Sequence, residues 1–275
     1  MRCAWDALLK ILPIPIREDV DRLGRDNLQE LRLRINAPPE LVTAKGSRFL
    51  AGKLTSEDLS FVVNTATRYS PWTAHTAAQG YITAPGGHRI GLCGEVVVKD
   101  GTVSGIRAIH SLCIRVARDF CGIAGGLAGC RTNLLILGPP GSGKTTLLRD
   151  LIRQLAEKNQ VAVVDGRGEL FPEGFQLGLH QDTLYGCPKD LAIERLLRTM
   201  GPDWIAVDEI TGESDAAALL SAARCGVRLA ATAHGFGIED LRNRKAYRPL
   251  WENRIFQTVL VMNRDKAFTM ERMMA

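Results

Sequence analysis

The chain has 275 residues, enough for one large domain or two ordinary ones, and its 45% hydrophobic and 24% charged residues are typical of a globular protein. No apolar run approaches the roughly 18 residues of a membrane span, and no signal peptide is recognisable, so the sequence predicts a cytoplasmic protein. The net charge of +5 is uneven, because residues 131–240 hold 11 basic against 15 acidic residues and residues 241–275 hold 8 against 3.

Residues 1–118 are predicted to form a smaller α+β domain whose strands make an antiparallel sheet. Alternating apolar residues and turn signals indicate its strands, and Ser56 with an acidic first turn opens a helix. The expected strands are 28–35, 41–44, 81–84, 88–92, 94–98 and 106–116. The glycine-rich stretch 119–131 is predicted to be a linker or hinge, or alternatively a short helix packed on the second domain.

From residue 132 to residue 275, short apolar runs alternate with helical patterns. This alternation predicts an α/β domain with a mainly parallel sheet and helices on both faces. The expected strands are 133–137, 161–165, 204–208 and 228–232 with a terminal hairpin at 256–263 and 267–272, and the expected helices are 146–155, 191–200 and 213–225. Ligands of such sheets bind beyond the carboxyl ends of the strands, so residues at those ends are the candidate site.

A phosphate-binding loop follows the first of these strands. Its sequence matches G-x-x-x-x-G-K-[ST] between a strand and a helix. The glycines expose backbone N–H groups, and the helix N-terminus adds partial positive charge, which together favour phosphate. Lys144 would reach the β- and γ-phosphates, and Thr145 would ligate Mg²⁺. We therefore expect ATP and Mg²⁺ as ligands, with nucleotide contacts from Gly138, Pro139, Pro140, Gly141, Ser142, Gly143, Lys144, Thr145 and Thr146.

Two acidic residues and a histidine lie at the ends of two later strands. Asp208-Glu209 is typical of a Walker B motif, in which Asp208 would hold Mg²⁺ and Glu209 would position the water that attacks the γ-phosphate. An acidic strand end that caps the next helix is the alternative. His234 follows the fourth strand, where an imidazole would donate to the γ-phosphate and report its presence.

The segment Asp165-Gly166-Arg167-Gly168-Glu169 follows the second strand. Its glycines permit a tight turn, so both carboxylates would face the nucleotide pocket, and Glu169 is a second candidate for water activation. An ordinary turn salt-bridged to Arg167 is the alternative. Hydrolysis also needs positive charge opposite the γ-phosphate, and the sequence does not choose among the candidates, which are Arg89, Arg107, Arg115, Arg118, Arg195, Arg198 and Arg224.

These segments together resemble a known family. The phosphate loop, residues 165–169, residues 203–213 and Thr232-Ala233-His234 are similar in order and context to the Walker A, aspartate, Walker B and histidine boxes of type II and type IV secretion ATPases. The first part narrows the resemblance to the stage III sporulation protein AA family of endospore-forming bacteria. The segments that carry it are Leu31–Arg34, Gly86–Gly94 and Ile114–Arg118.

The resemblance implies a RecA-like P-loop core and an ATPase of the channel between mother cell and forespore. It also implies a cytoplasmic homo-oligomeric ring, a hexamer, docked from the mother-cell side on membrane proteins of the same channel. In such rings the N-terminal domain supplies arginines to the nucleotide, and by position Arg115 and Arg89 are the candidates here. The chain lacks the tetracysteine zinc motif of the larger secretion ATPases and has a short N-terminal module, so their substrate contacts do not transfer.

Two other functions remain open at this stage. The same core serves nucleic-acid-handling ATPases, and the basic tail is compatible with that function, although its aromatic residues are few: Tyr247, Trp251 and Phe256. A nucleotide-gated scaffold that binds ATP and barely hydrolyses it is the third hypothesis. Hydrolysis by a ring that drives secretion or channel assembly is the prediction we carry forward.

Overall fold

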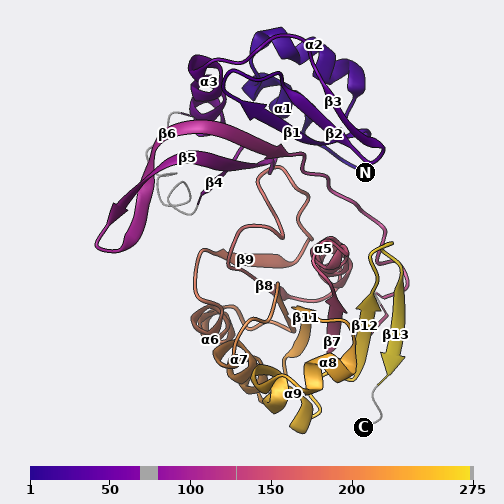
Figure 1. The fold of residues 1–275 in the computed structure, drawn as a ribbon. Helices are drawn as coiled ribbons and strands as arrows, with labels where there is room; N and C mark the ends of the chain where they lie inside the picture. Colours follow the sequence, from indigo (N-terminus) through magenta and orange to yellow (C-terminus); the bar gives the residue numbers. More distant parts are fainter. Residues whose placement is uncertain (69–79, 128, 273–275) are drawn as a thin grey trace. The chain divides into compact units, whose positions relative to one another are not determined.

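The computed structural model describes residues 1–68, 80–127 and 129–272 (Figure 1). The chain divides into two compact units, one made of Met1–Asp119 with Glu173–Phe175 and the other of Phe120–Pro172 with Gln176–Ala275. Within the described ranges, no helix combines the length and the apolar character needed to cross a membrane.

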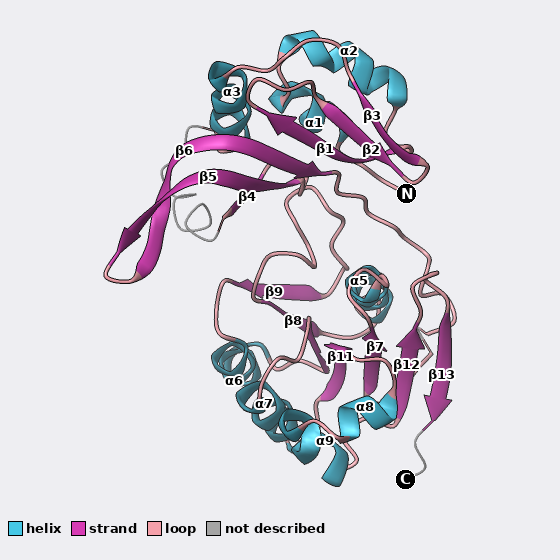
Figure 2. Ribbon diagram, viewed as in Figure 1, coloured by secondary structure: helices cyan, strands magenta, loops and turns pink. Residues whose placement is uncertain are grey.

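The first unit is an α+β fold built on one antiparallel sheet (Figure 2). In its described part, the sheet has the strand order β3-β2-β1-β6-β5-β4. The strands are β1 (Leu28–Arg34), β2 (Glu40–Thr43), β3 (Gly46–Phe49), β4 (Tyr81–Thr83), β5 (Arg89–Lys99) and β6 (Thr102–Arg115), and the helices are α1 (Trp5–Ile11), α2 (Ile14–Leu23) and α3 (Ser56–Ala66). The helices and the sheet share one core, whose fully buried residues include Leu8, Val20, Leu31, Leu59 and Ile114.

Three features of this unit differ from the sequence prediction or add to it. The segment 94–98 is the continuation of β5 and not a separate strand, and α1, α2 and β3 were not predicted. The helix expected at Ser56 begins there because Thr55 accepts the N–H of Asp58 while the Asp58 carboxylate accepts the N–H of Thr55, a capping box.

His88 fastens the turn between β4 and β5. Its side chain is fully buried, and Nδ1 accepts a hydrogen bond from the Ala117 N–H at 3.1 Å. Nε2 therefore carries the ring hydrogen and donates it to the Ala4 carbonyl, 3.1 Å away. Burial lowers the pKa of His88, opposed by the Ala4 hydrogen bond, so the imidazole that ties these three segments together is neutral.

The second unit is an α/β fold, as predicted. Over its described residues, the sheet has the order β13-β12-β7-β11-β10-β8-β9, and neighbouring strands are parallel except β12 with β13. The strands are β7 (Leu134–Gly138), β8 (Val161–Asp165), β9 (Gln181–Tyr185), β10 (Trp204–Val207), β11 (Arg228–His234), β12 (Thr258–Met262) and β13 (Phe268–Arg272). The helices are α5 (Lys144–Leu155), α6 (Lys189–Met200), α7 (Glu213–Arg224), α8 (Ile238–Arg242), α9 (Arg248–Glu252) and the 3₁₀ turn η2 (Lys245–Tyr247).

Helices cover both faces of this sheet, which confirms the expected layering (Figure 2). α5 packs on one face, where Leu148 and Ile152 are buried against β7 and β8. α6, α7, α8 and α9 pack on the other face, where Leu219 and Leu241 are buried. The strand β9, the helices α8 and α9 and the 3₁₀ turn η2 were not predicted, and β9 extends the parallel sheet beyond β8.

The glycine-rich segment after the first unit packs within the second one. Ala124 and Leu127 are buried in the core on the α5 face. The Asp150 carboxylate on α5 accepts the N–H groups of Gly122 and Ala124 at 2.9 and 2.8 Å. Residues 122–127 form a bend and turns rather than a helix, and residue 128 lies outside the described ranges. The domain limits 1–118 and 132–275 with the linker 119–131 stay a prediction.

Candidate functional site

Four neighbouring strands bring the predicted site residues to one edge of the sheet. β7, β11, β10 and β8 are adjacent in that order, and they end at Gly138, His234, Val207 and Asp165. Gly138 and His234 are paired across β7 and β11. Because parallel strands end at the same edge, the phosphate loop, Asp208-Glu209 and His234 meet there.

The phosphate loop connects β7 to α5 through a turn that only glycine fits at several points. Gly141 and Gly143 have φ values of 76° and 96°, in the left-handed region that disfavours side chains. A β-carbon on Gly138 would lie 2.6 Å from Ser142 Oγ and 2.9 Å from the Met262 carbonyl oxygen. Ser142 Oγ is buried without a hydrogen-bond partner among the described residues, as a group kept for a ligand would be.

Lys144 lies over this loop as a nearly buried cation. Its side chain is 6% exposed, and Nζ donates to the Pro139 carbonyl at 2.9 Å and lies 3.2 Å from His234 Nδ1. Burial lowers the pKa of Lys144, while the charges of Asp208 and Glu209 raise it. An anion bound at the loop would compensate the free-energy cost of burying this ammonium.

Thr145 and Asp208 form the oxygen-rich side of the site. Thr145 Oγ1 lies 3.3 Å from both carboxylate oxygens of Asp208, and Thr232 Oγ1 donates to Asp208 Oδ1 at 2.8 Å. Burial raises the pKa of Asp208, the Thr232 hydrogen bond lowers it, and nearby carboxylates including Glu169 and Glu209 raise it further. The Thr145 hydroxyl and the Asp208 carboxylate are hard oxygen ligands, the type that Mg²⁺ prefers. Because burial here disfavours an uncompensated negative charge, a divalent cation fits this place.

Glu209 lies between the histidine and the Asp165–Glu169 turn. Its φ of 54° is in the left-handed region, which is unusual for a residue with a side chain. Glu209 Oε1 is 3.1 Å from His234 Nε2, and Oε2 is 3.6 Å from Arg167. Lys144, His234 and Glu209 therefore form a continuous chain of contacts across the mouth of the loop.

The Asp165–Glu169 turn differs from the prediction in the role of Asp165. Its carboxylate does not face the pocket, because it accepts the N–H groups of Glu169 and Leu170 at 2.9 Å and of Phe171 at 3.2 Å. Burial raises the pKa of Asp165, and these three backbone hydrogen bonds oppose the shift. Arg167, which the alternative paired within its own turn, lies 3.6 Å from Glu209 Oε2.

The remaining predicted residues lie in different places. Glu169 is half-buried, and Arg149 on α5 donates to its carbonyl oxygen at 2.8 Å. Arg115 and Arg89 belong to the first unit, where Arg115 Nε is 3.4 Å from Glu30 Oε1 and the Arg89 guanidinium is 4.0 Å from the centre of the Tyr81 ring. The roles of Glu169, Arg115 and Arg89 stay predictions.

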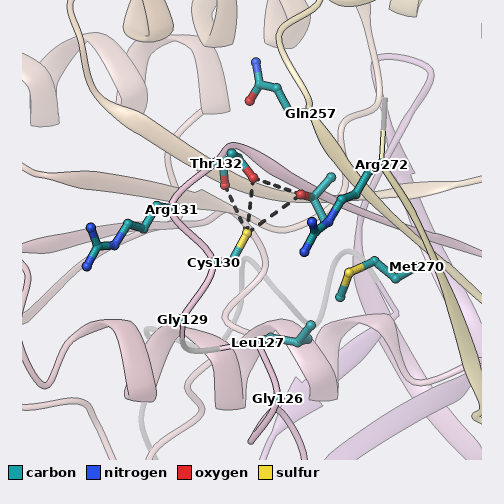
Figure 3. Close-up of a pocket in the computed structure, with 10 residues that line it drawn as sticks. Gly126, Leu127, Gly129, Cys130, Arg131, Thr132, Gln257, Met270 and Arg272 are labelled. Atoms are coloured by element: carbon teal, nitrogen blue, oxygen red, sulfur yellow. Dashed lines mark hydrogen bonds between the residues drawn. The ribbon is translucent and has the colours of Figure 1, made fainter. Parts of the chain in front are cut away.

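One pocket of the second unit borders this site, and another lies away from it. One of about 230 Å³ borders the phosphate loop and includes Thr146; its walls are Phe120, Ile123, Gly143, Thr146, Leu147, Met262, Lys266 and Phe268. The other, of about 600 Å³, lies at the amino ends of β7 and β12, where the hydroxyls of Thr132 and Thr258 are 2.8 Å apart and Cys130 contacts both (Figure 3). No predicted site residue lines this larger pocket, so it is separate from the candidate site.

Sequence reasoning missed two residues of the site. Thr232 Oγ1 accepts the Glu209 N–H at 2.7 Å, and Lys189 on α6 donates to the Glu209 carbonyl oxygen. Thr232 belongs to the segment Thr232-Ala233-His234, which the sequence already indicated as part of the site. Nothing in the local sequence distinguishes Lys189 from a surface lysine.

Comparison with known proteins shows the family to which the chain belongs. The family described as Sporulation stage III, protein AA matches residues 5–271 of this chain. Stage III sporulation protein AA of Bacillus subtilis (strain 168) is 39% identical over 280 residues, which covers 94% of this chain and 91% of that protein.

Solved structures share the fold across both units. The pilus retraction motor PilT, crystallised with ADP, matches with a TM-score of 0.66 at 17% identity, covering 91% of this chain and 77% of that one. The ATPase DotB of Legionella pneumophila matches with a TM-score of 0.60 at 16% identity, covering 95% and 81%. At these identities the matches show a common fold, and they confirm the predicted α/β class with a preceding smaller domain.

Proposed function

The chain belongs to the stage III sporulation protein AA family, and we propose that it is an ATP-binding and ATP-hydrolysing motor protein of sporulation. The observation that carries the proposal is the meeting of three groups at one sheet edge: the Lys144 ammonium, the Thr145–Asp208 oxygens and the Glu209 carboxylate. The fold it shares with an ATPase and a pilus retraction motor supports the same function.

The loop Gly138–Thr146 would hold the phosphates of ATP. Its backbone N–H groups and the Ser142 hydroxyl, which has no hydrogen-bond partner among the described residues, would bind phosphate oxygens. Lys144 would exchange its Pro139 contact for the β- and γ-phosphates. Thr146 borders the apolar pocket of about 230 Å³, which would take the adenosine part.

Thr145 and Asp208 would hold Mg²⁺. When bound, the ion neutralises negative charge on the β- and γ-phosphate oxygens. The buried Asp208 carboxylate, whose pKa burial raises, would be stabilised in its ionised form by the cation. Thr232 orients this carboxylate through its hydrogen bond at 2.8 Å.

Glu209 would orient the attacking water, with Glu169 as the second candidate. The water oxygen bonds to the γ-phosphorus, the bond from that phosphorus to the β–γ bridging oxygen breaks, and ADP leaves with the electron pair. Glu209 accepts the water proton or passes it to phosphate. His234, now between Lys144 and Glu209, would donate to the γ-phosphate and report its presence.

The motor would act as a homo-oligomeric ring, a hexamer, on the mother-cell side of a membrane complex. Arg115 and Arg89 of the first unit are the proposed cations that complete the site. The ring would power or assemble a channel between mother cell and forespore, docked from the cytoplasm on membrane proteins of the same channel. Oligomeric mass measured with and without ATP, together with the hydrolysis rate per chain against protein concentration, tests the ring.

Phosphate release from Mg²⁺-ATP by the purified chain tests the function. We expect Lys144→Ala to abolish nucleotide binding and turnover, and Glu209→Ala to keep binding while losing at least about 100-fold in rate. Lys158→Ala, an exposed lysine after α5, is the matched control and keeps full activity. Undiminished turnover in both site variants would refute the assignment.

The same assay separates the other two functions. Hydrolysis stimulated by single-stranded DNA, with binding that weakens steeply with salt, would indicate a nucleic-acid-handling ATPase instead. Intact ATP recovered after prolonged incubation with the assembled protein would indicate a scaffold.

A further inference from the structure

Side chains hold the backbone of Glu209 on both sides of its α-carbon. Its N–H donates to Thr232 Oγ1 at 2.7 Å, and its carbonyl oxygen accepts from Lys189 Nζ. Because the φ of 54° is unfavourable for a residue with a β-carbon, it persists only where the surroundings determine it. The Thr232 and Lys189 contacts fix the two peptide groups that flank the Glu209 α-carbon, and they therefore restrain this φ.

Lys189 is fixed between three segments. It is the first residue of α6, its side chain is only 17% exposed, and Nζ lies 3.8 Å from Asp215 Oδ2. That same Asp215 oxygen accepts from the N–H and the hydroxyl of Thr211 at 2.9 and 2.8 Å. A β-carbon on Gly166 would come within 3.9 Å of Lys189 Cε, so the lysine stem crosses the Asp165–Glu169 turn.

This placement differs from that of an ordinary surface lysine. A mostly buried ammonium is costly unless it is hydrogen-bonded and paired, and here a carbonyl oxygen and an 8% exposed carboxylate provide both contacts. Neither group lies in the phosphate loop, so these two contacts of Lys189 are not with residues that would bind the nucleotide.

We propose that Lys189 is a positioning residue for hydrolysis. By holding the Glu209 carbonyl, it keeps that backbone in the left-handed conformation and the carboxylate at the 3.1 Å contact with His234, where the attacking water would be oriented. The inference rests on the proposed ATPase function and adds a residue from α6 to it. Asp215 acts behind Lys189 by anchoring the ammonium.

The test compares Lys189→Met with wild type in the full-length chain. Methionine has a similar length and no N–H, so it removes the contact with the Glu209 carbonyl and leaves no large cavity. We expect kcat to fall about 10- to 100-fold, as a misplacement of about 1 Å does, while KM and the Kd for ATP change less than about threefold. Lys189→Arg, which keeps a charged donor, recovers most of kcat, and Asp215→Asn has a smaller effect of the same kind.

A crystal structure of Lys189→Met gives a readout that does not depend on hydrolysis. We expect the φ of Glu209 to leave the left-handed region and the distance from Glu209 Oε1 to His234 Nε2 to increase beyond 3.1 Å. Lys158→Met is the matched control in both measurements and changes neither.

Each outcome decides the inference. An unchanged kcat, or an unchanged Glu209 conformation in the variant structure, overturns it. Loss of ATP binding in parallel with kcat, without recovery in Lys189→Arg, also overturns it, because a general folding defect behaves that way. A wild-type chain that hydrolyses no ATP refutes the proposed function instead, and the crystal structures still decide whether Lys189 sets the Glu209 conformation.

Discussion

Thr232→Val is the substitution that most directly tests how the Asp208–Glu209 end of β10 is held. Thr232 is fully buried on β11, and its hydroxyl accepts the Glu209 N–H at 2.7 Å while donating to Asp208 Oδ1 at 2.8 Å. Valine has the same shape but offers neither bond. A buried N–H left unsatisfied costs about 1–3 kcal/mol, and a lost hydrogen bond to a charged group costs about 1.5–3 kcal/mol.

The two losses together destabilise the second unit by about 2.5–6 kcal/mol. A protein domain has about 5–15 kcal/mol of unfolding free energy in total, so the effect is large. For a domain of roughly 150 residues, it lowers Tm by roughly 10 °C. Chemical denaturation and thermal unfolding of the full chain measure both quantities.

Thr232→Ser makes the reasoning refutable. Serine keeps both hydrogen bonds and loses one buried methyl group, which costs about 1 kcal/mol. If the hydrogen bonds dominate, the order of stability is wild type, then Thr232→Ser, then Thr232→Val. A Thr232→Val protein more stable than Thr232→Ser would show that packing on β11 outweighs the two bonds, and the account of this strand end would be wrong.

Two further predictions concern stability, one at the turn that His88 holds and one in the phosphate loop. Because burial lowers the pKa of His88 in the folded state, the unfolded chain, with a His pKa of about 6.5, binds more protons as the pH falls below that value. The free energy of unfolding of the first unit therefore falls as the pH drops from about 6.5 to the folded pKa, by up to about 1.4 kcal/mol per pH unit. In His88→Gln the free energy of unfolding changes less between pH 7.5 and 5.5, and equal slopes in the two proteins contradict the prediction. Gly138→Ala places a β-carbon 2.6 Å from Ser142 Oγ and 2.9 Å from the Met262 carbonyl oxygen, so it costs about 1–3 kcal/mol of stability and weakens nucleotide binding. Gly126→Ala, where the added β-carbon meets open space, changes stability by less than about 0.5 kcal/mol. Equal effects in the two variants refute the steric argument.

The second unit is predictable from sequence where burial is complete. The runs 134–138, 161–165 and 204–207 are buried at every residue, so their apolar composition indicates strands regardless of neighbours. β9 was missed because Gln181–Tyr185 is half-exposed and mostly polar, and it becomes a strand only by pairing with β8. The short helices α8 and α9, of five residues each, carry too few positions for a periodic pattern.

The candidate site shows the same division between local and distant information. The phosphate loop is contiguous, so its glycine positions follow from sequence alone. Asp165 was placed correctly at a strand end but misassigned, because whether a carboxylate faces a ligand or its own turn depends on the path of the next six residues. Lys189 meets Glu209 only because α6 packs on β8, the neighbour of β10, which no local pattern encodes.

Thr232 is the exception, since its role was within reach of the sequence. In a strand, residues two apart share a face of the sheet, so the period of two along β11 places the Thr232 and His234 side chains on the same face. β10 is a parallel neighbour of β11, and Asp208 and Glu209 follow its last residue. The hydroxyl then holds the Asp208 carboxylate and the Glu209 N–H, and the imidazole holds the Glu209 carboxylate. Since β11 also pairs with β7 at Gly138, one strand connects the phosphate loop to Glu209, and a shift of β11 along β7 would change both contacts together.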